Sequence, residues 1–423
     1  MNPQPAQAPE HERVGALPDN LSRSAGARGL AKVAIGPAFI ASIAYVDPGN
    51  LATNVLAGGQ YGFLLLWVVV VASFMAMLVQ YLSAKLGVAT GENLPEVCRR
   101  RFRPWVRNGL WVQAELVVIM TDLAELVGGA IALHLLFGVS LFVGALLMVG
   151  AAFVILGLRV RGRSGFRTIV LALLAVVLLA FVYQVVREPV SLRQLVGGFV
   201  PRLAGTDSTV LAAGIIGATV MPHVIYLHSG LTQGLTALRP STPIRRLLRW
   251  SRADVMVAMS VAGGVNVAIL VVATAIPASA ASTLQDAYVA LGTDIGAGAG
   301  LVFAVALLAS GLAASCVGVY SGQVIMAGFI RRQIPIWVRR TVSAIPPLVV
   351  LGSGVDATRA LVFSQVVLSF GIPFALIPLV VFTGDRAVMG VLVNHRMTTM
   401  VAVLAVALII ALNVYLLGSL VPS

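Results

Sequence analysis

Long apolar segments separated by short polar connections make up most of this chain of 423 residues. Each segment is close to the ~20 residues that an α-helix needs to cross the hydrocarbon core of a bilayer. A separation as short as Gly138 to Ser140 divides two of them. The pattern predicts an all-α integral membrane protein with eleven transmembrane helices, at residues 33–57, 63–87, 108–137, 140–158, 166–186, 208–232, 253–277, 297–330, 338–354, 358–383 and 400–420.

Composition and charge agree with this pattern. Hydrophobic residues make up 59% of the chain and charged residues 11%, whereas soluble domains carry about 25% charged residues. The net charge of +13 is unevenly distributed, because 25 of the 29 lysines and arginines lie in alternate connections counted from the N-terminus. Basic residues collect on the cytoplasmic side of membrane proteins. We therefore predict a cytoplasmic N-terminus, an external C-terminus and no nucleic-acid partner.

The connections and tails contain no sign of a further domain. They are short, and the sequence lacks the glycine-rich GxxxxGKS/T motif that binds nucleotide phosphates. Neither an enzyme activity nor transport driven by ATP on this chain is expected. Residues 1–32 contain many Pro, Ala and Arg residues and predict a disordered cytoplasmic tail. The short tails and the absence of a targeting segment indicate the inner membrane of a bacterium.

Polar and helix-breaking residues interrupt the first apolar segment at Asp47-Pro48-Gly49-Asn50. An acid at the centre of a bilayer costs roughly 2.5–3.5 kcal/mol, so such acids usually serve a function. Pro48 and Gly49 make a continuous helix through this point unfavourable. Unwound backbone at membrane depth is tolerated only where it is buried in protein or lines a cavity. The motif therefore predicts a buried cation site on a broken helix.

A second interruption, Met221-Pro222-His223, lies in the sixth apolar segment. In both interruptions an alanine, Ala44 or Ala218, precedes the proline by four residues, with a candidate ligand directly before the proline. The interruptions lie five predicted helices apart, and an odd number of helices inverts the second unit relative to the first. Pro222 alone would also be explained by a packing kink. The shared spacing favours two five-helix inverted repeats, at 33–186 and 208–383, with broken first and sixth helices. Residues 400–423 then form an extra helix with a short external tail.

The residues around the two interruptions form a mixed set of candidate metal ligands. Because proline has no N–H, the carbonyl groups of Ala44 and Ala218 lose their usual helical donors at Pro48 and Pro222. Asp47 offers a carboxylate, Asn50 an amide oxygen and Met221 a thioether. Hard oxygen together with soft sulfur suits Mn²⁺ or Fe²⁺ and would also admit Cd²⁺. The alternative for Met221 is that it only fills space in the core or faces lipid.

Three acids lie on one face of the third predicted helix, namely Glu115, Asp122 and Glu125. Three acids on one face of a membrane helix cannot face lipid. They have a structural explanation, which is ion pairing with Arg339 and Arg340 of the ninth predicted helix. Ion pairing does not exclude transport, because a chain of ionisable groups also relays protons.

At these positions the chain resembles the Nramp family of divalent-metal/proton symporters (natural resistance-associated macrophage proteins). The match extends over residues 33–420. Its most specific motifs are Asp47-Pro48-Gly49-Asn50, Thr121-Asp122-Leu123-Ala124-Glu125, Met221-Pro222-His223, and Gln365 followed by Gly371-Ile372-Pro373-Phe374.

The resemblance implies roles for individual residues. The metal ligands it implies are Asp47, Asn50 and Met221, helped by the carbonyl groups of Ala218 and Ala44, with Gln365 approaching the ion in an occluded state. The proton path it implies is lined by Asp47, His223, Asp122 and Glu125, with Arg339 and Arg340 near its cytoplasmic end. Glu115, about two turns before Asp122, belongs to the same face. His223 also adjoins the second interruption, and a histidine ordinarily changes charge between pH 5 and 8.

These observations predict a secondary active symporter that imports Mn²⁺, Fe²⁺ and also Cd²⁺ with protons by alternating access. Its partners are then the metal, protons and the lipid bilayer, with no resident cofactor and no obligate protein partner. Two alternatives remain. A sodium-coupled amino-acid symporter has the same inverted-repeat design, but Asp47 would repel the substrate carboxylate. A metal-permeable channel would conduct faster and would not concentrate metal against a gradient.

Overall fold

The computed structural model describes residues 36–160, 165–187, 192–238, 240–294, 296–332 and 334–420. The predicted tail at 1–32 and the last residues, 421–423, lie outside these ranges. Within them the chain is helical and contains no β-strand. In chain order the elements are α2 (Pro37–Ser42), η2 (Ile43–Val46), α3 (Pro48–Tyr61), η3 (Gly62–Leu65), α4 (Leu66–Thr90), α5 (Leu94–Arg101), α6 (Pro104–Phe137), α7 (Leu141–Val160), α8 (Gly165–Arg187), α9 (Leu192–Gly197), α10 (Thr206–Thr219), α11 (Pro222–Thr232), α12 (Leu235–Leu238), α13 (Ile244–Ala273), η4 (Ala278–Ala280), α14 (Leu284–Asp294), α15 (Ala297–Ile330), α16 (Ile336–Gly352), α17 (Ala357–Gly384), α18 (Arg386–Met389), η5 (Gly390–Leu392) and α19 (Arg396–Leu420).

Eight helical stretches in the described residues are long and apolar enough to cross a membrane. One of them, Pro48–Thr90, joins α3 and α4 through η3. The apolar helices Pro37–Val46 and Leu141–Ile155 are shorter. Length and hydropathy thus establish about eight strongly apolar helices, and the count of eleven crossings stays a prediction.

Most predicted helix boundaries agree with the structure within a few residues, and α13 is the main exception. It begins at Ile244, whereas the hydropathy pattern placed its start at residue 253. The first turns carry arginines, which lower the hydropathy, but Leu247 and Leu248 are buried and pack with Val88. The narrow separation after α6 is confirmed, because Gly138 ends that helix in a left-handed conformation with φ 68°. Glycine adopts this conformation without the penalty that a side chain brings.

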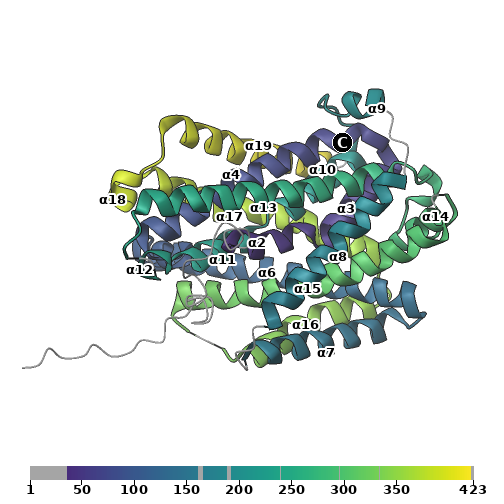
Figure 1. Cartoon of the computed structure of the whole chain (residues 1–423), viewed down its shortest axis with the longest axis horizontal. Helices are drawn as coiled ribbons and strands as arrows, with labels where there is room; N and C mark the ends of the chain where they lie inside the picture. The colour runs from purple at the N-terminus through teal and green to yellow at the C-terminus, as the bar shows by residue number, and fades with distance from the viewer. Residues whose placement is uncertain are drawn as a thin grey trace, which may run out of the picture.

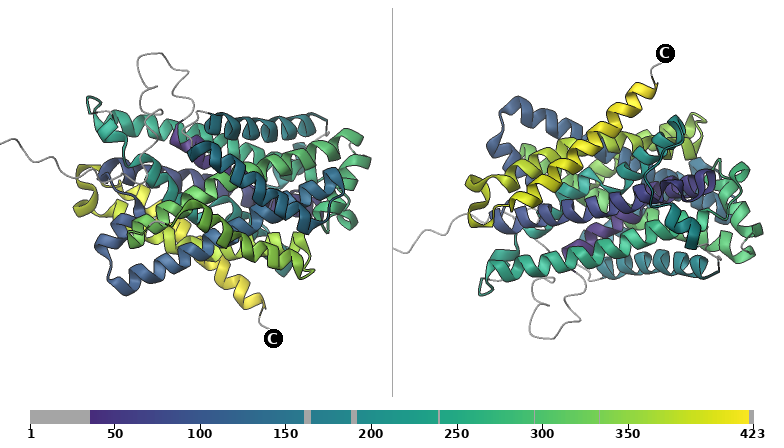
Figure 2. Two further views of the ribbon diagram at one scale, coloured as in Figure 1. Left: turned by 90° about the horizontal axis from the view of Figure 1, so that it is seen from below. Right: turned by 90° about the horizontal axis from the view of Figure 1, so that it is seen from above.

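The long helices pack in a bundle with the broken segments in its interior (Figure 1). α6 packs against α15 and α17, while α4 packs against α13. α7 and α16 pack against each other at one edge of the bundle, and α19 lies at the opposite edge, where it crosses the other helices obliquely (Figures 1 and 2). Every residue of α11 is buried, as are the first twelve residues of α3. The interior of the bundle is therefore occupied by two short helices that each begin at a proline.

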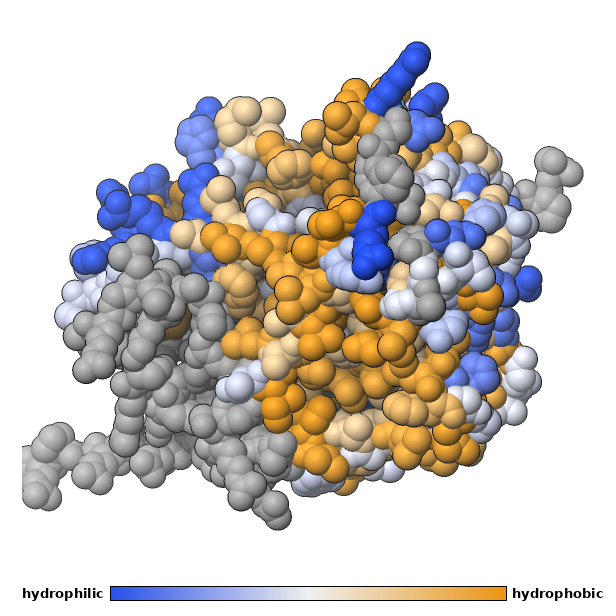
Figure 3. Space-filling view, turned by 45° about the vertical axis from the view of Figure 1, so that its right-hand side comes forward, coloured by the Kyte–Doolittle hydropathy of each residue, from blue (hydrophilic) through white to orange (hydrophobic). Residues whose placement is uncertain are grey.

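The outer surface of the bundle is apolar. Figure 3 shows a broad hydrophobic face with hydrophilic residues gathered towards its edges. Large apolar side chains on the outer helices are well exposed, including Leu179 (66%) on α8 and Leu404 (67%) and Val414 (62%) on α19. Exposed apolar area on this scale marks contact with a partner or a membrane rather than with water. The surface therefore agrees with the hydropathy pattern.

Candidate functional site

Helical geometry is interrupted at Asp47, between η2 and α3. Asp47 has extended backbone angles (φ −87°, ψ 170°) and caps the N-terminus of α3. Its Oδ1 atom accepts hydrogen bonds from the backbone N–H of Asn50 (2.8 Å) and from the Asn50 side-chain amide (3.0 Å). Asp47 is 1% exposed, and its Oδ2 atom is buried and accepts no hydrogen bond from any described residue. A buried carboxylate oxygen without a partner is costly, so it favours a bound proton or cation.

A second interruption separates α10 from α11. α10 ends at Thr219, the backbone leaves helical geometry at Val220 and Met221, and α11 begins at Pro222. The Met221 side chain is fully buried. The proline sits at the first position of α11, where its missing N–H removes no helical hydrogen bond.

The side chain of Asn50 joins the two interruptions. Its Nδ2 group donates to the carbonyl oxygen of Ala218 (2.7 Å) as well as to Asp47. Its Oδ1 atom accepts a hydrogen bond from the Thr219 hydroxyl (3.0 Å). A single amide nitrogen therefore holds a carboxylate oxygen and a freed carbonyl oxygen together, across 168 positions of sequence. Thr219, which the sequence did not single out, orients that amide.

Gln365 of α17 lies against the same place. A side chain at Gly49 would overlap its amide, and a side chain at Gly217 of α10 would overlap its backbone carbonyl. Its Nε2 group donates to Ser364 (3.0 Å), whereas its Oε1 atom is buried and accepts no hydrogen bond from the described residues. The structure thus brings Gln365 beside the Asp47–Asn50 turn, and glycines provide the space for it.

Ala44 lies in η2, directly before two carbonyl groups that have side-chain partners. The Tyr45 carbonyl accepts from the Asn266 amide of α13 (2.9 Å), and the Val46 carbonyl accepts from the Ser310 hydroxyl of α15 (2.6 Å). Sequence reasoning missed Asn266 and Ser310. The available signal was a polar residue inside an otherwise apolar helix, and the fold shows what each of them does.

The acids of α6 form ion pairs with α16. Both terminal guanidinium nitrogens of Arg339 donate to the Glu115 carboxylate, at 2.6 and 3.3 Å. Arg340 is fully buried and lies 2.6 Å from Asp122 and 3.9 Å from Glu125. The second guanidinium nitrogen of Arg340 donates to the Ser315 hydroxyl of α15 (2.7 Å). The ion pairing considered as a structural explanation is therefore formed.

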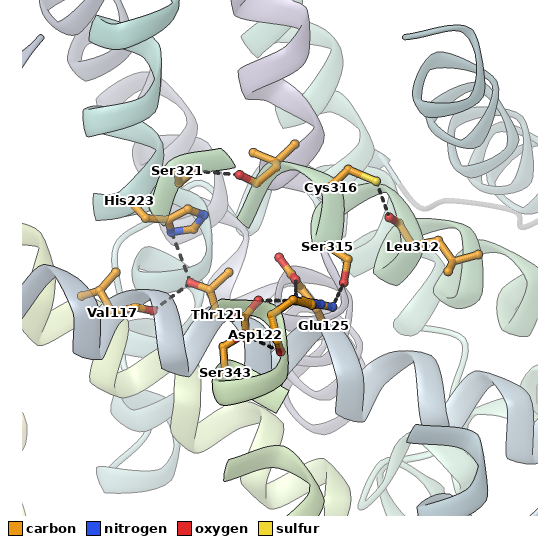
Figure 4. Close-up of polar contacts among 12 residues, drawn as sticks. Val117, Thr121, Asp122, Glu125, His223, Leu312, Ser315, Cys316, Ser321 and Ser343 are labelled. Atoms are coloured by element: carbon orange, nitrogen blue, oxygen red, sulfur yellow. Dashed lines mark hydrogen bonds and ion pairs between the residues drawn. The ribbon is translucent and has the colours of Figure 1, made fainter. Parts of the chain in front are cut away.

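His223 connects this charged cluster with the second interruption. Its Nδ1 atom lies 3.2 Å from the hydroxyl of Thr121, the residue before Asp122, and its Nε2 atom has no partner among the described residues. Figure 4 shows His223 facing Thr121, with Asp122, Glu125 and Ser315 further along the same region. Ionisable side chains thus extend from α11 to α16 through the interior of the bundle.

A second buried histidine takes part in a separate contact. His228 lies 2.8 Å from the Gln80 side-chain oxygen, and the Gln80 amide donates to the Tyr45 hydroxyl (2.5 Å). These side chains join α11, α4 and η2. On α13, the Asp254 carboxylate accepts from the N–H groups of Gly36 and Ala38 and caps the start of α2. Neither contact could be predicted from the sequence, because each joins helices that are distant along the chain.

No group of three or more His, Cys, Asp or Glu side chains with metal-site spacing occurs in the described residues. A metal ion at the two interruptions would instead meet one carboxylate, amide and carbonyl oxygens, and a thioether. Most of these candidate ligands are uncharged, whereas sites that retain a resident metal often use several anionic ligands.

Comparisons with known proteins point to one family. Residues 38–419 match the family model described as "Natural resistance-associated macrophage protein-like" (Nramp). A Bacillus subtilis protein named "Divalent metal cation transporter MntH" is 46% identical over 416 residues, which cover 97% of each chain. The Deinococcus radiodurans protein of the same name is 47% identical over 99% of this chain and 97% of its own.

Solved structures agree with the sequence comparisons. The crystal structure of an Eremococcus coleocola manganese transporter, in complex with an aromatic bis-isothiourea substituted compound, is 30% identical with a TM-score of 0.80. The alignment covers 92% of this chain and 87% of that one. A structure titled "Inward facing conformation of Mhp1" is 16% identical with a TM-score of 0.56, which indicates a shared fold alone.

Proposed function

The chain belongs to the natural resistance-associated macrophage protein-like (Nramp) family, and from this membership we propose that it is a symporter importing divalent transition metals with protons. It is a multi-pass membrane transporter rather than an enzyme. The proposed substrates are Mn²⁺ and Fe²⁺, with Cd²⁺ also admitted. Relatives named as divalent metal cation transporters and a manganese transporter of similar structure support this choice.

The observation that carries the proposal is the position of the Asn50 amide. Its nitrogen sits between the Asp47 carboxylate and the Ala218 carbonyl, while Asp47 Oδ2 and Gln365 Oε1 are buried without donors in the described part of the chain. Exchanging the amide nitrogen and oxygen by rotation would place three oxygens together, an arrangement that only a cation stabilises. We infer that the metal binds here, with Asp47, Asn50, the Ala218 and Ala44 carbonyls and Met221 as ligands and Gln365 nearby.

Proton coupling follows from the need for an ionised ligand. A carboxylate must lose its proton before it binds a metal, so metal entry displaces a proton from Asp47. His223 and the acids Asp122, Glu125 and Glu115, with Arg339 and Arg340, form the proposed route by which protons reach the cytoplasm. The contacts from His223 through Thr121 to the Asp122–Arg340 pair support this route.

We propose alternating access between two inverted repeats, at 33–186 and 208–383, with residues 400–423 as an additional helix. In this assignment the first and sixth of eleven membrane helices are broken. The two broken helices contact each other through α3 and α10. Helices in equivalent positions of the two repeats also pack on each other, namely α4 with α13, α6 with α15 and α7 with α16. Packing of equivalent pairs is expected where two related units face each other around a shared site.

We propose that the protein lies in the bacterial inner membrane, with a cytoplasmic N-terminus and an external C-terminus. The asymmetric distribution of basic residues supports this orientation.

Reconstituted uptake tests the proposed function. In proteoliposomes with an acidic exterior, Mn²⁺ should accumulate above its equilibrium level, and the accumulation should collapse when a protonophore removes the gradient. Uptake that stops at equilibrium would indicate a channel. Uptake that depends on Na⁺ and is competed by amino acids would indicate the other alternative. Parallel measurements with Fe²⁺, Cd²⁺, Ca²⁺ and Mg²⁺ define the substrate range.

Replacing Met221 with leucine tests the thioether as a ligand. The variant keeps an apolar side chain of similar volume but loses the soft donor, so Cd²⁺ and Mn²⁺ should bind about 10–100-fold more weakly. Ca²⁺, which prefers oxygen, should be affected less. Isothermal titration of the purified protein measures each affinity. Met148→Leu, at a buried position on α7, is the matched control. Equal losses for all ions would contradict the ligand assignment.

A further inference from the structure

A cavity of about 710 Å³ opens among α5, the first turns of α6 and the C-terminal end of α15. It is distinct from the proposed metal site, with which it shares no residue. Its charged lining residues are Glu92, Glu96, Arg99, Arg100, Arg107, Arg331 and Arg332. These residues lie on the side that the distribution of basic residues predicts to be cytoplasmic.

The cavity carries an excess of positive charge. Only Arg100 forms an ion pair within it, at 2.8 Å from Glu92, and the other four arginines pair with no acid among the described residues. The Glu96 carboxylate accepts the Asn93 N–H and caps α5, and burial raises its pKa. A cavity lined by more arginines than glutamates repels a divalent cation, so it is not part of the proposed metal path. It favours an anion.

The guanidinium groups are close enough to affect one another. Burial lowers the pKa of Arg99 and the neighbouring Arg331 lowers it further, whereas Glu96 and Glu92, each with a smaller effect, raise it. Arg99 also donates to the carbonyl groups of Ala327 and Gly328 at the end of α15, which positions its side chain. An anion between Arg99 and Arg331 would turn their repulsion into attraction.

The backbone at Arg331 is unusual. It is the only residue other than glycine with a positive φ (55°) in the described part of the chain. This conformation costs a non-glycine residue roughly 1–2 kcal/mol. It ends α15 and brings Arg331 and Arg332 into the cavity lining together. Retaining an arginine where glycine would be favoured agrees with a role for its side chain.

Apolar residues on the lipid-facing side of α6 lie next to this charge. Val112, which is 51% exposed, lines the cavity, and Leu116, which is 54% exposed, follows one turn later. Trp105, at the start of α6, is 72% exposed, as is common for aromatic residues at a membrane interface. A basic cavity beside exposed apolar side chains can receive a charged head group while the acyl chains contact the helix.

We propose that this cavity binds a phosphate group, supplied by the head group of an acidic phospholipid of the cytoplasmic leaflet. Basic pockets between membrane helices on this side are suited to such head groups. Free inorganic phosphate has the same chemistry, and the apolar side of α6 favours the lipid. Arg331, Arg332 and Arg107 provide the charge that contacts the phosphate oxygens, while Arg99 is held by the carbonyl groups at the end of α15.

Lipid binding in detergent tests the proposal without any transport measurement. The full-length protein in detergent is titrated with phosphatidylglycerol, phosphatidylcholine or inorganic phosphate, and bound lipid is counted by native mass spectrometry while thermal unfolding is followed. We expect saturable binding of phosphatidylglycerol, no such binding of phosphatidylcholine, and a higher unfolding temperature with the acidic lipid. Saturable binding of inorganic phosphate alone would identify the free ion as the source and overturn the lipid assignment.

Two double variants complete the test. Arg331→Ala/Arg332→Ala should weaken phosphatidylglycerol binding about 30-fold, because each arginine near an anionic surface is worth about 1 kcal/mol. Arg245→Ala/Arg249→Ala removes two exposed arginines of α13 outside the cavity and should leave the affinity unchanged. An equal loss in both variants would show only general attraction to a basic surface and would overturn the site. Unchanged binding of phosphatidylglycerol to Arg331→Ala/Arg332→Ala would also overturn the site.

Discussion

Replacing Asp47 with alanine is expected to reduce Mn²⁺ uptake into proteoliposomes by more than about 100-fold, since residues that only support a ligand are already worth about 10–100-fold. The reason is that Asp47 is the only anionic group among the proposed ligands. Its buried Oδ2 atom accepts no hydrogen bond from the residues that the structure describes, so no such donor competes with a metal. Without the carboxylate, a divalent cation would have to leave water for amide, carbonyl and thioether groups that cannot balance its charge.

Two variants make the Asp47 result interpretable. Asp47→Asn keeps the size and a side-chain oxygen that can accept the N–H of Asn50, so α3 should stay capped while uptake is still lost. Asp294→Ala removes an exposed acid at the end of α14 and should transport normally. Size-exclusion profiles and unfolding temperatures verify that each variant is folded. Mn²⁺ uptake near the wild-type rate in a folded Asp47→Ala protein would falsify the proposed site.

Replacing Arg340 with methionine is expected to destabilise the protein by about 3–5 kcal/mol, because removing one partner of a buried ion pair leaves an uncompensated charge. Arg340 is fully buried and contacts Asp122 at 2.6 Å, Glu125 at 3.9 Å and the Ser315 hydroxyl at 2.7 Å. Methionine fills a similar length but satisfies none of these groups. Chemical unfolding of the purified protein in detergent measures the change in the free energy of unfolding. The unfolding temperature should also be lower.

The neighbouring arginine is the natural control for Arg340. The side chains of Arg339 and Glu115 are 10% and 20% exposed, so water replaces part of the lost interaction. Arg339→Met should therefore destabilise less than Arg340→Met. Adding Asp122→Asn to Arg340→Met removes the unpaired carboxylate and should recover much of the loss, since replacing both partners of a buried pair is often nearly neutral. Equal effects of the two single variants would contradict the importance of burial.

The helices illustrate how far hydropathy predicts this fold. The predicted segment 297–330 coincides with α15, because apolar residues continue along the whole length of that helix. α13 differs, since its arginine-bearing first turns are stabilised by Leu247 and Leu248 packing with Val88. The short helix α14 was also not predicted. Packing between helices decides such boundaries, and hydropathy averaged over neighbouring residues carries no information about that packing.

Some residues of the candidate site could likewise be predicted from the sequence, and others could not. Asp47, Pro48 and Pro222 were recognisable in the sequence because an acid or a proline is unfavourable in an apolar helix wherever the helix lies. The roles of Thr219, Asn266 and Ser310 were not, since each hydroxyl or amide acts on a group from another helix. Serine and threonine are also common in membrane helices without such a role.

The sequence by itself determined that this protein is a helical membrane protein with two interruptions of defined chemistry, because hydropathy and the missing proline N–H act locally along the chain. The tertiary structure decided which groups meet. The Asn50 amide contacts Ala218, which is 168 positions away in the sequence. Arg340 contacts Asp122, which is 218 positions away. It also decided that the arginines of α5 and those directly after α15 share one cavity. These contacts depend on the distances and orientations between packed helices, which the order of residues along one helix does not contain.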